Sequence, residues 1–148
     1  MKKQLFLKDY IQIADIHADR LTIALTKLQP IIPFSIQKLQ HLSPEQLGYT
    51  DMLTTRFGKL QDVIGTKVFP LILDLLEEDA AAFIDKLNRL EKLGYLENSS
   101  WWLELREMRN TLTHDYPDDL LRSEHLNALI PKSYELLDFW KKFKEKIR

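Results

Sequence analysis

An arginine and a histidine separated by four residues are the side chains in this sequence best suited to chemistry. Arg109 is followed directly by Asn110, His114 comes after four intervening residues, and Tyr116 stands two positions further on. Histidine is the side chain whose unperturbed pKa lets it take or give a proton near neutral pH. The planar guanidinium of arginine offers a fork of N–H donors to a phosphate. The pair is therefore suited to holding a phosphate group and moving protons beside it.

One amphipathic helix is predicted to position these groups. Ser99 or Ser100 can cap its first turn, and the helix should stop by Tyr116, because the residue before a proline is disfavoured in the helical region. Apolar residues recur along it in steps of four and three, which predicts a stripe that faces the core. The stripe consists of Trp101, Leu105, Met108 and Leu112.

A second arc of the same helix carries the polar groups, since each residue of a helix turns by about 100°. Two large apolar residues, Trp102 and Leu103, fall on this arc near the start of the helix. Such residues are out of place on a plain solvated face, so we expect a second surface to cover the arc. Its polar members are Arg106, Arg109, Asn110 and His114.

These residues resemble the motif of the HEPN superfamily of small helical ribonucleases. Arg109 to His114 matches its pattern of an arginine, a polar residue, and a histidine after four intervening positions. Tyr116 completes the longer form, Arg-(four residues)-His-X-Tyr, which is similar to that of HepT-like toxins encoded beside a minimal nucleotidyltransferase antitoxin. The resemblance is close over residues 109–116 and extends to the rest of the chain only through length and helix order.

The resemblance implies a metal-independent endoribonuclease without cofactors, the toxin of a type VII-like toxin–antitoxin system. It further implies a homodimer in which one Arg-His pair from each protomer lines a composite cleft that cleaves RNA. Arg109 and His114 would be catalytic, with Asn110 supporting them and Arg106 adding a contact to RNA phosphate. Tyr116 would be the site of AMPylation by the nucleotidyltransferase antitoxin. Bulky negative charge next to the Arg-His pair would block a phosphate-binding cleft and so silence the enzyme.

Plainer interpretations of the same residues stay open. Arg109 can pair with Glu107 or Asp115, since exposed ion pairs of this kind are common and weak. Arg106 can likewise pair with Glu107 or Glu104. His114 can simply lie at the negative end of the helix dipole, and Tyr116 can pack over the helix end. The alternative function is a non-catalytic helical binding module for a nucleotidyltransferase partner or a nucleotide, in which the Arg-His pair only holds an anion.

Length and composition fit a single helical domain over residues 1–148. The chain has no cysteine, 45% hydrophobic residues and a formal net charge of −1. A chain of this length can bury one core without disulfides, and its charge gives no overall attraction to nucleic acid, so an RNA contact needs a local patch. The other histidines, His17, His41 and His125, stand alone, so no metal site is expected. No apolar run approaches the roughly 20 residues that cross a bilayer, and we expect a cytoplasmic protein without membrane contact.

The apolar periodicity predicts an all-α fold, an antiparallel bundle of about five helices that resembles the HEPN fold. A long helix is expected over residues 4–28 and a short one within residues 31–42. Residues 43–46 form either a helix cap with proline in the first turn or a tight turn. Asp51 is expected to cap the next long helix, which should bend near Thr66.

Local sequence signals also predict where the later helices begin and end. A helix is expected to begin at Asp79 and to close at Gly94, which suits a left-handed cap. Asp118 can cap the last helical segment, which Pro131 bends or divides. No stretch shows the alternating pattern of a strand.

Overall fold

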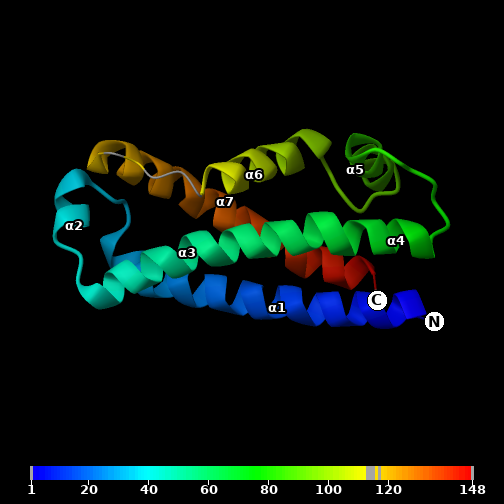
Figure 1. Ribbon diagram of the computed structural model, residues 1–148, viewed down its shortest axis with the longest axis horizontal. Coiled ribbons are helices and arrows are strands. Elements are labelled where there is room, and N and C mark those ends of the chain that lie inside the picture. Colours follow the sequence, from blue (N-terminus) through cyan, green and yellow to red (C-terminus); the bar gives the residue numbers. More distant parts are fainter. Residues whose placement is uncertain (1, 113–115, 117, 148) are drawn as a thin grey trace.

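The computed structural model describes residues 2–112, 116 and 118–147, and all regular structure in them is helical (Figure 1). The predicted all-α class is therefore confirmed. In the described ranges no helix is long and apolar enough to cross a membrane. The helices are α1 (Lys2–Leu28), α2 (Ile36–Gln40), α3 (Pro44–Val63), α4 (Phe69–Leu75), α5 (Phe83–Lys92), α6 (Ser99–Thr111) and α7 (Asp119–Lys146), with a 3₁₀ turn η1 (Gln29–Ile31) and a π-helical turn η2 (Ile64–Val68).

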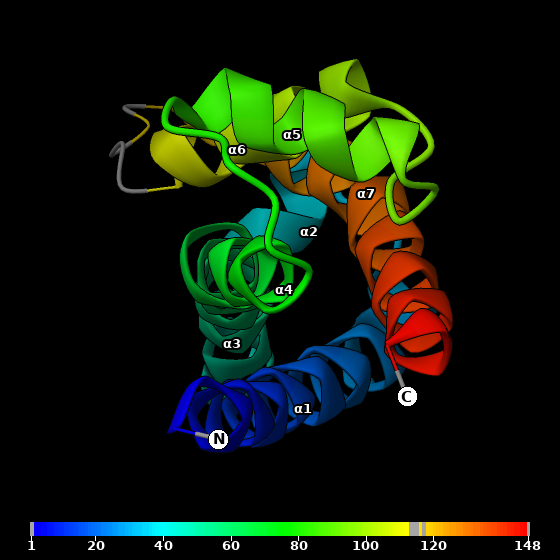
Figure 2. The same ribbon diagram turned by 90° about the vertical axis from the view of Figure 1, so that its right-hand side faces the viewer.

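The helices surround one core, as the view along the bundle shows (Figure 2). The continuous rod of α3, η2 and α4 lies along α1. α7 runs on the opposite side of the core from this rod, and α5 and α6 cover the top, opposite α1. Helix α6, which carries Arg109 and Asn110, contacts α3 on one side and lies across the bundle from α1 (Figure 2). The largest fully buried side chains are Trp102, Trp140, Phe57, Phe69 and Phe143.

Trp102 fastens α6 to the core of its own chain. It is 0% exposed, and its ring centroid lies 4.7 Å from that of Phe69 on α4 and 5.6 Å from that of Phe139 on α7. Gly65 in η2 allows this approach, because a Cβ there would lie 3.2 Å from Nε1 of Trp102. Trp102 was expected to be covered by a further surface, and helices α4 and α7 of the same chain cover it. Trp102 therefore gives no argument for a second protomer.

Helix α3 begins seven residues before the expected cap at Asp51. Ser43 and Gln46 form a capping box: the Ser43 hydroxyl accepts from the Gln46 N–H at 3.1 Å, and the Gln46 side chain accepts from the Ser43 N–H at 2.9 Å. With Pro44 in the first turn, this cap outcompetes Asp51, which lies inside the helix. Of the two interpretations of residues 43–46, the cap is confirmed. At Thr66, where a bend was expected, the structure has the π-helical turn η2.

Two other helix starts differ from prediction. α5 begins after Ala82 rather than at Asp79. α6 is capped by Asn98, one residue earlier than expected, whose Oδ1 accepts from the backbone N–H of Ser100 at 2.8 Å. An asparagine caps as well as a serine does, and Ser99 instead donates its backbone N–H to Glu91.

The remaining helix limits agree with the sequence. Gly94 has φ +86°, the left-handed conformation expected after α5. Asp118 caps α7 by accepting from the backbone N–H of Leu121 at 2.8 Å. Pro131 does not divide α7, which is continuous from Asp119 to Lys146.

His17 should make the stability of the fold depend on pH. Arg56 on α3 donates from Nη1 to Nδ1 of His17 at 2.9 Å. Burial, and then the positive charges of Arg56, Lys59 and Arg20, lower the pKa of His17 below 6.5. Its neutral form is therefore favoured in the folded state. This contribution is complete above about pH 6.5 and is lost as the pH falls towards the folded pKa, because the unfolded chain takes up the proton first.

We therefore expect the wild type to lose more stability between about pH 7.5 and about pH 5 than His17→Gln, which keeps an acceptor for Arg56 but does not titrate in this range. Urea unfolding at the two pH values measures this difference. An equal loss in both proteins would contradict the assignment.

Candidate functional site

Arg109 lies on the last turn of α6, where this helix meets α3. Its Nη1 donates to Oδ1 of Asp62 at 2.8 Å, and its Nη2 donates to Oδ1 of Asn110 at 2.9 Å. The side chain of Arg109 is 31% exposed. A guanidinium has five N–H donors, so one N–H on each terminal nitrogen is left over from these two bonds. Nε is buried and has no partner among the described residues.

Gly58 permits the contact between the two helices at this point. A Cβ at position 58 would lie 3.1 Å from Cδ1 of Leu112 and 3.5 Å from Cγ of Arg109. A side chain at position 58 would therefore press on the side chains of Leu112 and Arg109. Asp62 follows one helical turn after Gly58, which brings its carboxylate to the guanidinium.

A hollow of about 410 Å³ opens beside this ion pair. It contains two basic side chains, Arg109 and Lys59, and one acidic side chain, Asp62. Within the described residues Lys59 has no ion pair. The local charge of the lining is thus positive although the chain as a whole is slightly acidic, which suits an anion such as phosphate. The lining residues are Thr54, Thr55, Gly58, Lys59, Asp62, Arg109, Asn110 and Leu112.

A second hollow of about 300 Å³ adjoins the first, since Thr54 and Leu112 line both. Tyr116 and Arg122 also line it. The half-buried ring of Tyr116 packs against His125 of α7, with the ring centroids 5.1 Å apart. Tyr116 is therefore held by α7, which differs from the interpretation that it packs over the end of its own helix.

His114 lies outside the described residues. Its distance from Arg109 and the support expected from Asn110 therefore stay predictions. In the sequence, His114 stands two positions after Leu112 and two before Tyr116. Both of these residues line the second hollow, and Leu112 also lines the first.

Arg106 is not brought together with Arg109. Its guanidinium carbon lies 4.6 Å from the ring centroid of Phe83 on α5, and it does not line the hollow beside Arg109. Within the described residues Arg106 forms no ion pair with Glu104 or Glu107, and Glu104 pairs instead with Lys132 of α7 at 3.2 Å.

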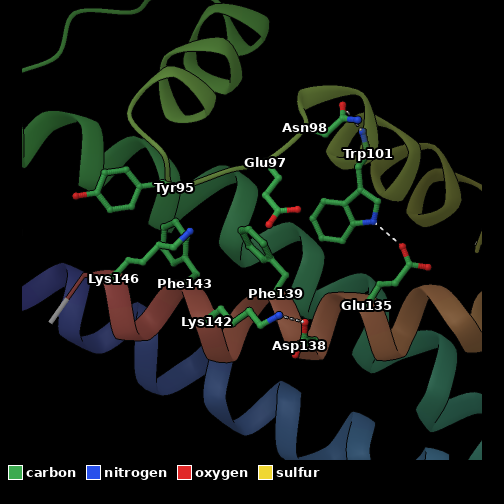
Figure 3. A pocket seen from close by; sticks show the side chains of 10 residues that line it. All are labelled: Tyr95, Glu97, Asn98, Trp101, Glu135, Asp138, Phe139, Lys142, Phe143 and Lys146. Carbon is green, nitrogen blue, oxygen red and sulfur yellow. Dashed lines mark hydrogen bonds and ion pairs between the residues drawn. The ribbon is translucent and has the colours of Figure 1, made fainter.

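A third hollow, of about 370 Å³, lies between α7 and the segment that leads into α6 (Figure 3). Aromatic rings form its floor, and most of its polar groups are paired with one another. Trp101 donates from Nε1 to Glu135 at 2.9 Å, and Lys142 pairs with Asp138 at 2.9 Å. The side chain of Glu97 points in over these rings (Figure 3). Arg109, Asn110, Thr111, Leu112 and Tyr116, the described residues of the motif segment, do not line this hollow.

No protein-family model matches this chain. No curated protein and no solved structure matches it either. The resemblance to HEPN ribonucleases therefore rests on residues 109–116 and on the all-helical fold.

Sequence reasoning missed several residues of the two hollows. Lys59 and Asp62 lie on the polar side of α3, and nothing in their spacing indicates that α6 crosses there. Gly58 was the one usable signal, since a glycine inside a helix often marks close helix contact. His125 was treated as a histidine that stands alone, and it packs on Tyr116 and lines the second hollow. Arg122 lines the same hollow and was not singled out.

Proposed function

We propose that this chain is a metal-independent endoribonuclease of the HepT-like kind, working as a homodimer. The observation that carries the proposal is the position of Arg109. Its guanidinium borders an open, positively charged hollow together with Lys59, and one N–H on each terminal nitrogen is not used by Asp62 or Asn110. An arginine arranged in this way can bind a phosphate of the RNA backbone through two parallel hydrogen bonds.

The proposed reaction uses the RNA's own 2′-hydroxyl. The 2′-oxygen attacks the adjacent phosphorus, the bond from phosphorus to the 5′-oxygen breaks, and the products carry a 2′,3′-cyclic phosphate and a 5′-hydroxyl. One proton leaves the 2′-oxygen and another reaches the 5′-oxygen, so the reaction needs a base and an acid. Two copies of His114, one from each protomer, would supply these groups, and Arg109 and Lys59 would stabilise the charge on the phosphorane-like transition state.

Asp62 and Asn110 would position the guanidinium in this proposal. Each accepts one hydrogen bond from it, and an arginine held at two points loses less side-chain freedom when it binds phosphate. Tyr116 would be the control point. Since it lines the hollow next to that of Arg109, AMP added to it by a nucleotidyltransferase antitoxin would bring negative charge towards the RNA-binding surface.

One observation favours the alternative, a non-catalytic module that binds a nucleotidyltransferase or a nucleotide. The charge of Arg109 is already paired with Asp62 at 2.8 Å, which weakens its attraction for a further anion. Expression of the chain alone separates the two functions. A ribonuclease toxin should arrest growth and a Tyr116→Phe variant, which cannot accept AMP, should still arrest it when the antitoxin is present. A binding module should arrest growth in neither case.

The reaction itself is tested with purified protein, single-stranded RNA and an excess of EDTA. We expect cleavage in EDTA, products with 2′,3′-cyclic phosphate ends, and no cleavage of DNA of the same sequence, which lacks the 2′-hydroxyl. Cleavage only after addition of a divalent metal, or cleavage of the DNA, would contradict the proposed chemistry.

A further inference from the structure

Helix α1 exposes an apolar seam along one face, beside the face that packs into the core. Phe6 is 45% exposed, Ile13 40%, Ile16 46% and Ile23 47%. Large aliphatic side chains in such a row along one helix are unusual on a monomer surface and mark a contact with another molecule. The residues of α1 that face the core are a different set: Ala14, Leu21, Ala24, Leu25 and Leu28.

The seam has the spacing of a coiled coil. Its apolar residues and two charged ones occupy positions 6, 9, 13, 16, 20 and 23, which alternate in steps of three and four. This is the spacing of a and d positions, whose side chains stay on one line when two helices pack together. The charged members are Asp9 and Arg20. Both are exposed, and within the described residues neither side chain has an ion pair or hydrogen bond.

We propose that α1 pairs antiparallel with α1 of a second copy of this chain, about a twofold axis that passes between residues 14 and 15. In an antiparallel pair, a positions face d positions. Phe6 then faces Ile23 of the partner subunit, and Ile13 faces Ile16 of the partner subunit. Asp9 faces Arg20 of the partner subunit, and this opposite-charge contact occurs twice because the interface is symmetric.

Asp9 and Arg20 favour α1 of a second copy as the partner helix, and they favour the antiparallel orientation over the parallel one. In a parallel pair in register, Asp9 would face its own copy and Arg20 would face its own copy, and both contacts are repulsive. Only the antiparallel arrangement about this axis pairs every apolar residue with an apolar one and every charge with its opposite. Polar groups at a and d positions commonly set register and direction in this way.

The seam has a defined length. The next positions outward are Lys2 and Lys27, which would face each other with like charge, so the contact ends inside them. Residues 6 to 23 of a helix span about 26 Å at 1.5 Å per residue. The contact is thus several turns long on both copies.

This inference goes beyond the proposed ribonuclease, because it concerns a different surface. α6, which carries Arg109, lies at the top of the bundle and α1 at the bottom (Figure 2). Pairing through α1 therefore supplies a contact between copies that does not depend on the Arg109 hollow. Its test measures how substitutions in α1 change assembly, whereas the ribonuclease is tested by RNA cleavage, so the α1 contact can fail while cleavage is observed, and cleavage can fail while the α1 contact is observed.

Charge reversal tests the seam by sedimentation velocity of the full chain. We expect Asp9→Arg and Arg20→Asp each to weaken self-association through α1 by about a hundredfold or more, because like charges then face each other twice across an interface. The mass of the assembly should at least halve at concentrations where the wild type is associated. The double variant Asp9→Arg/Arg20→Asp should restore it, since the charges are exchanged and again opposite.

Mixing gives the sharper result. The two single variants, each unable to pair with itself through α1, should pair with each other through α1 when mixed in equal proportions and so regain the wild-type mass, because every arginine then faces an aspartate. Ile36→Glu, at an equally exposed isoleucine on α2, is the matched control and should leave the mass unchanged, whereas Ile16→Glu should lower it. Circular dichroism checks that all variants stay helical. A monomeric wild type at high concentration, unchanged mass in both single variants, or no gain in mass when the two single variants are mixed would overturn the proposal.

Discussion

Replacing Arg109 with alanine is expected to lower the rate of RNA cleavage by about a hundredfold to a thousandfold while the protein stays folded. Removal of one group that stabilises transition-state charge typically has an effect of this size. The fold should tolerate the change, because the ion pair with Asp62 joins side chains that are 31% and 47% exposed, and such pairs contribute about 1 kcal/mol or less.

Two variants make this result specific. Arg89→Ala removes another ion-paired arginine, which contacts Glu78 from α5 at 3.3 Å and does not line the Arg109 hollow; its cleavage rate should equal that of the wild type. Arg109→Lys keeps the charge but loses the planar fork, so we expect an intermediate rate. If Arg109→Ala cleaves as fast as Arg89→Ala, Arg109 has no catalytic role.

Replacing Trp102 with alanine is expected to lower the free energy of unfolding by about 3–5 kcal/mol, the usual cost of truncating a large buried aromatic residue. Trp102 is 0% exposed and lies against Phe69, Phe139 and Gly65. Chemical unfolding followed by circular dichroism measures the change. Trp101→Ala is the matched control, because Trp101 is only partly buried and its indole N–H bonds to the exposed Glu135. It should cost clearly less.

Measuring the loss of stability in Trp102→Ala at several protein concentrations shows whether Trp102 is covered by its own chain or by a second subunit. Its contacts are all within one chain, so the loss of stability should be the same at low and high protein concentration. A loss that appears only where the protein is associated would mean that a second subunit covers the residue.

The periodicity of apolar residues predicted the helical class, because the formation of a helix depends on residues that are close to one another in the sequence. Local chemistry also placed several helix ends correctly: Gly94 adopts the left-handed conformation, and Asp118 caps α7. Where two candidate caps competed, sequence alone chose wrongly. Ser43 forms a reciprocal box with Gln46 and Asp51 does not, and this difference depends on side-chain geometry that a residue type does not reveal.

The site depended on contacts between distant segments, and those were not predictable. Asp62 reaches Arg109 across 47 positions because Gly58 lets α6 lie close to α3. Trp102 was placed on a polar arc by helical angles, yet α4 and α7 cover it. An angle around a helix shows which residues share a face, but it does not show which part of the chain packs against that face.

The most direct test of the account compares RNA cleavage by the wild type and by His114→Ala, both in EDTA. His41→Ala is the control, since it removes an exposed histidine next to α2. A positioned general acid or base typically contributes about 10²–10⁴-fold to a rate, so we predict a loss of that size for His114→Ala and none for His41→Ala. Cleavage that persists at the wild-type rate in His114→Ala would contradict the proposed ribonuclease.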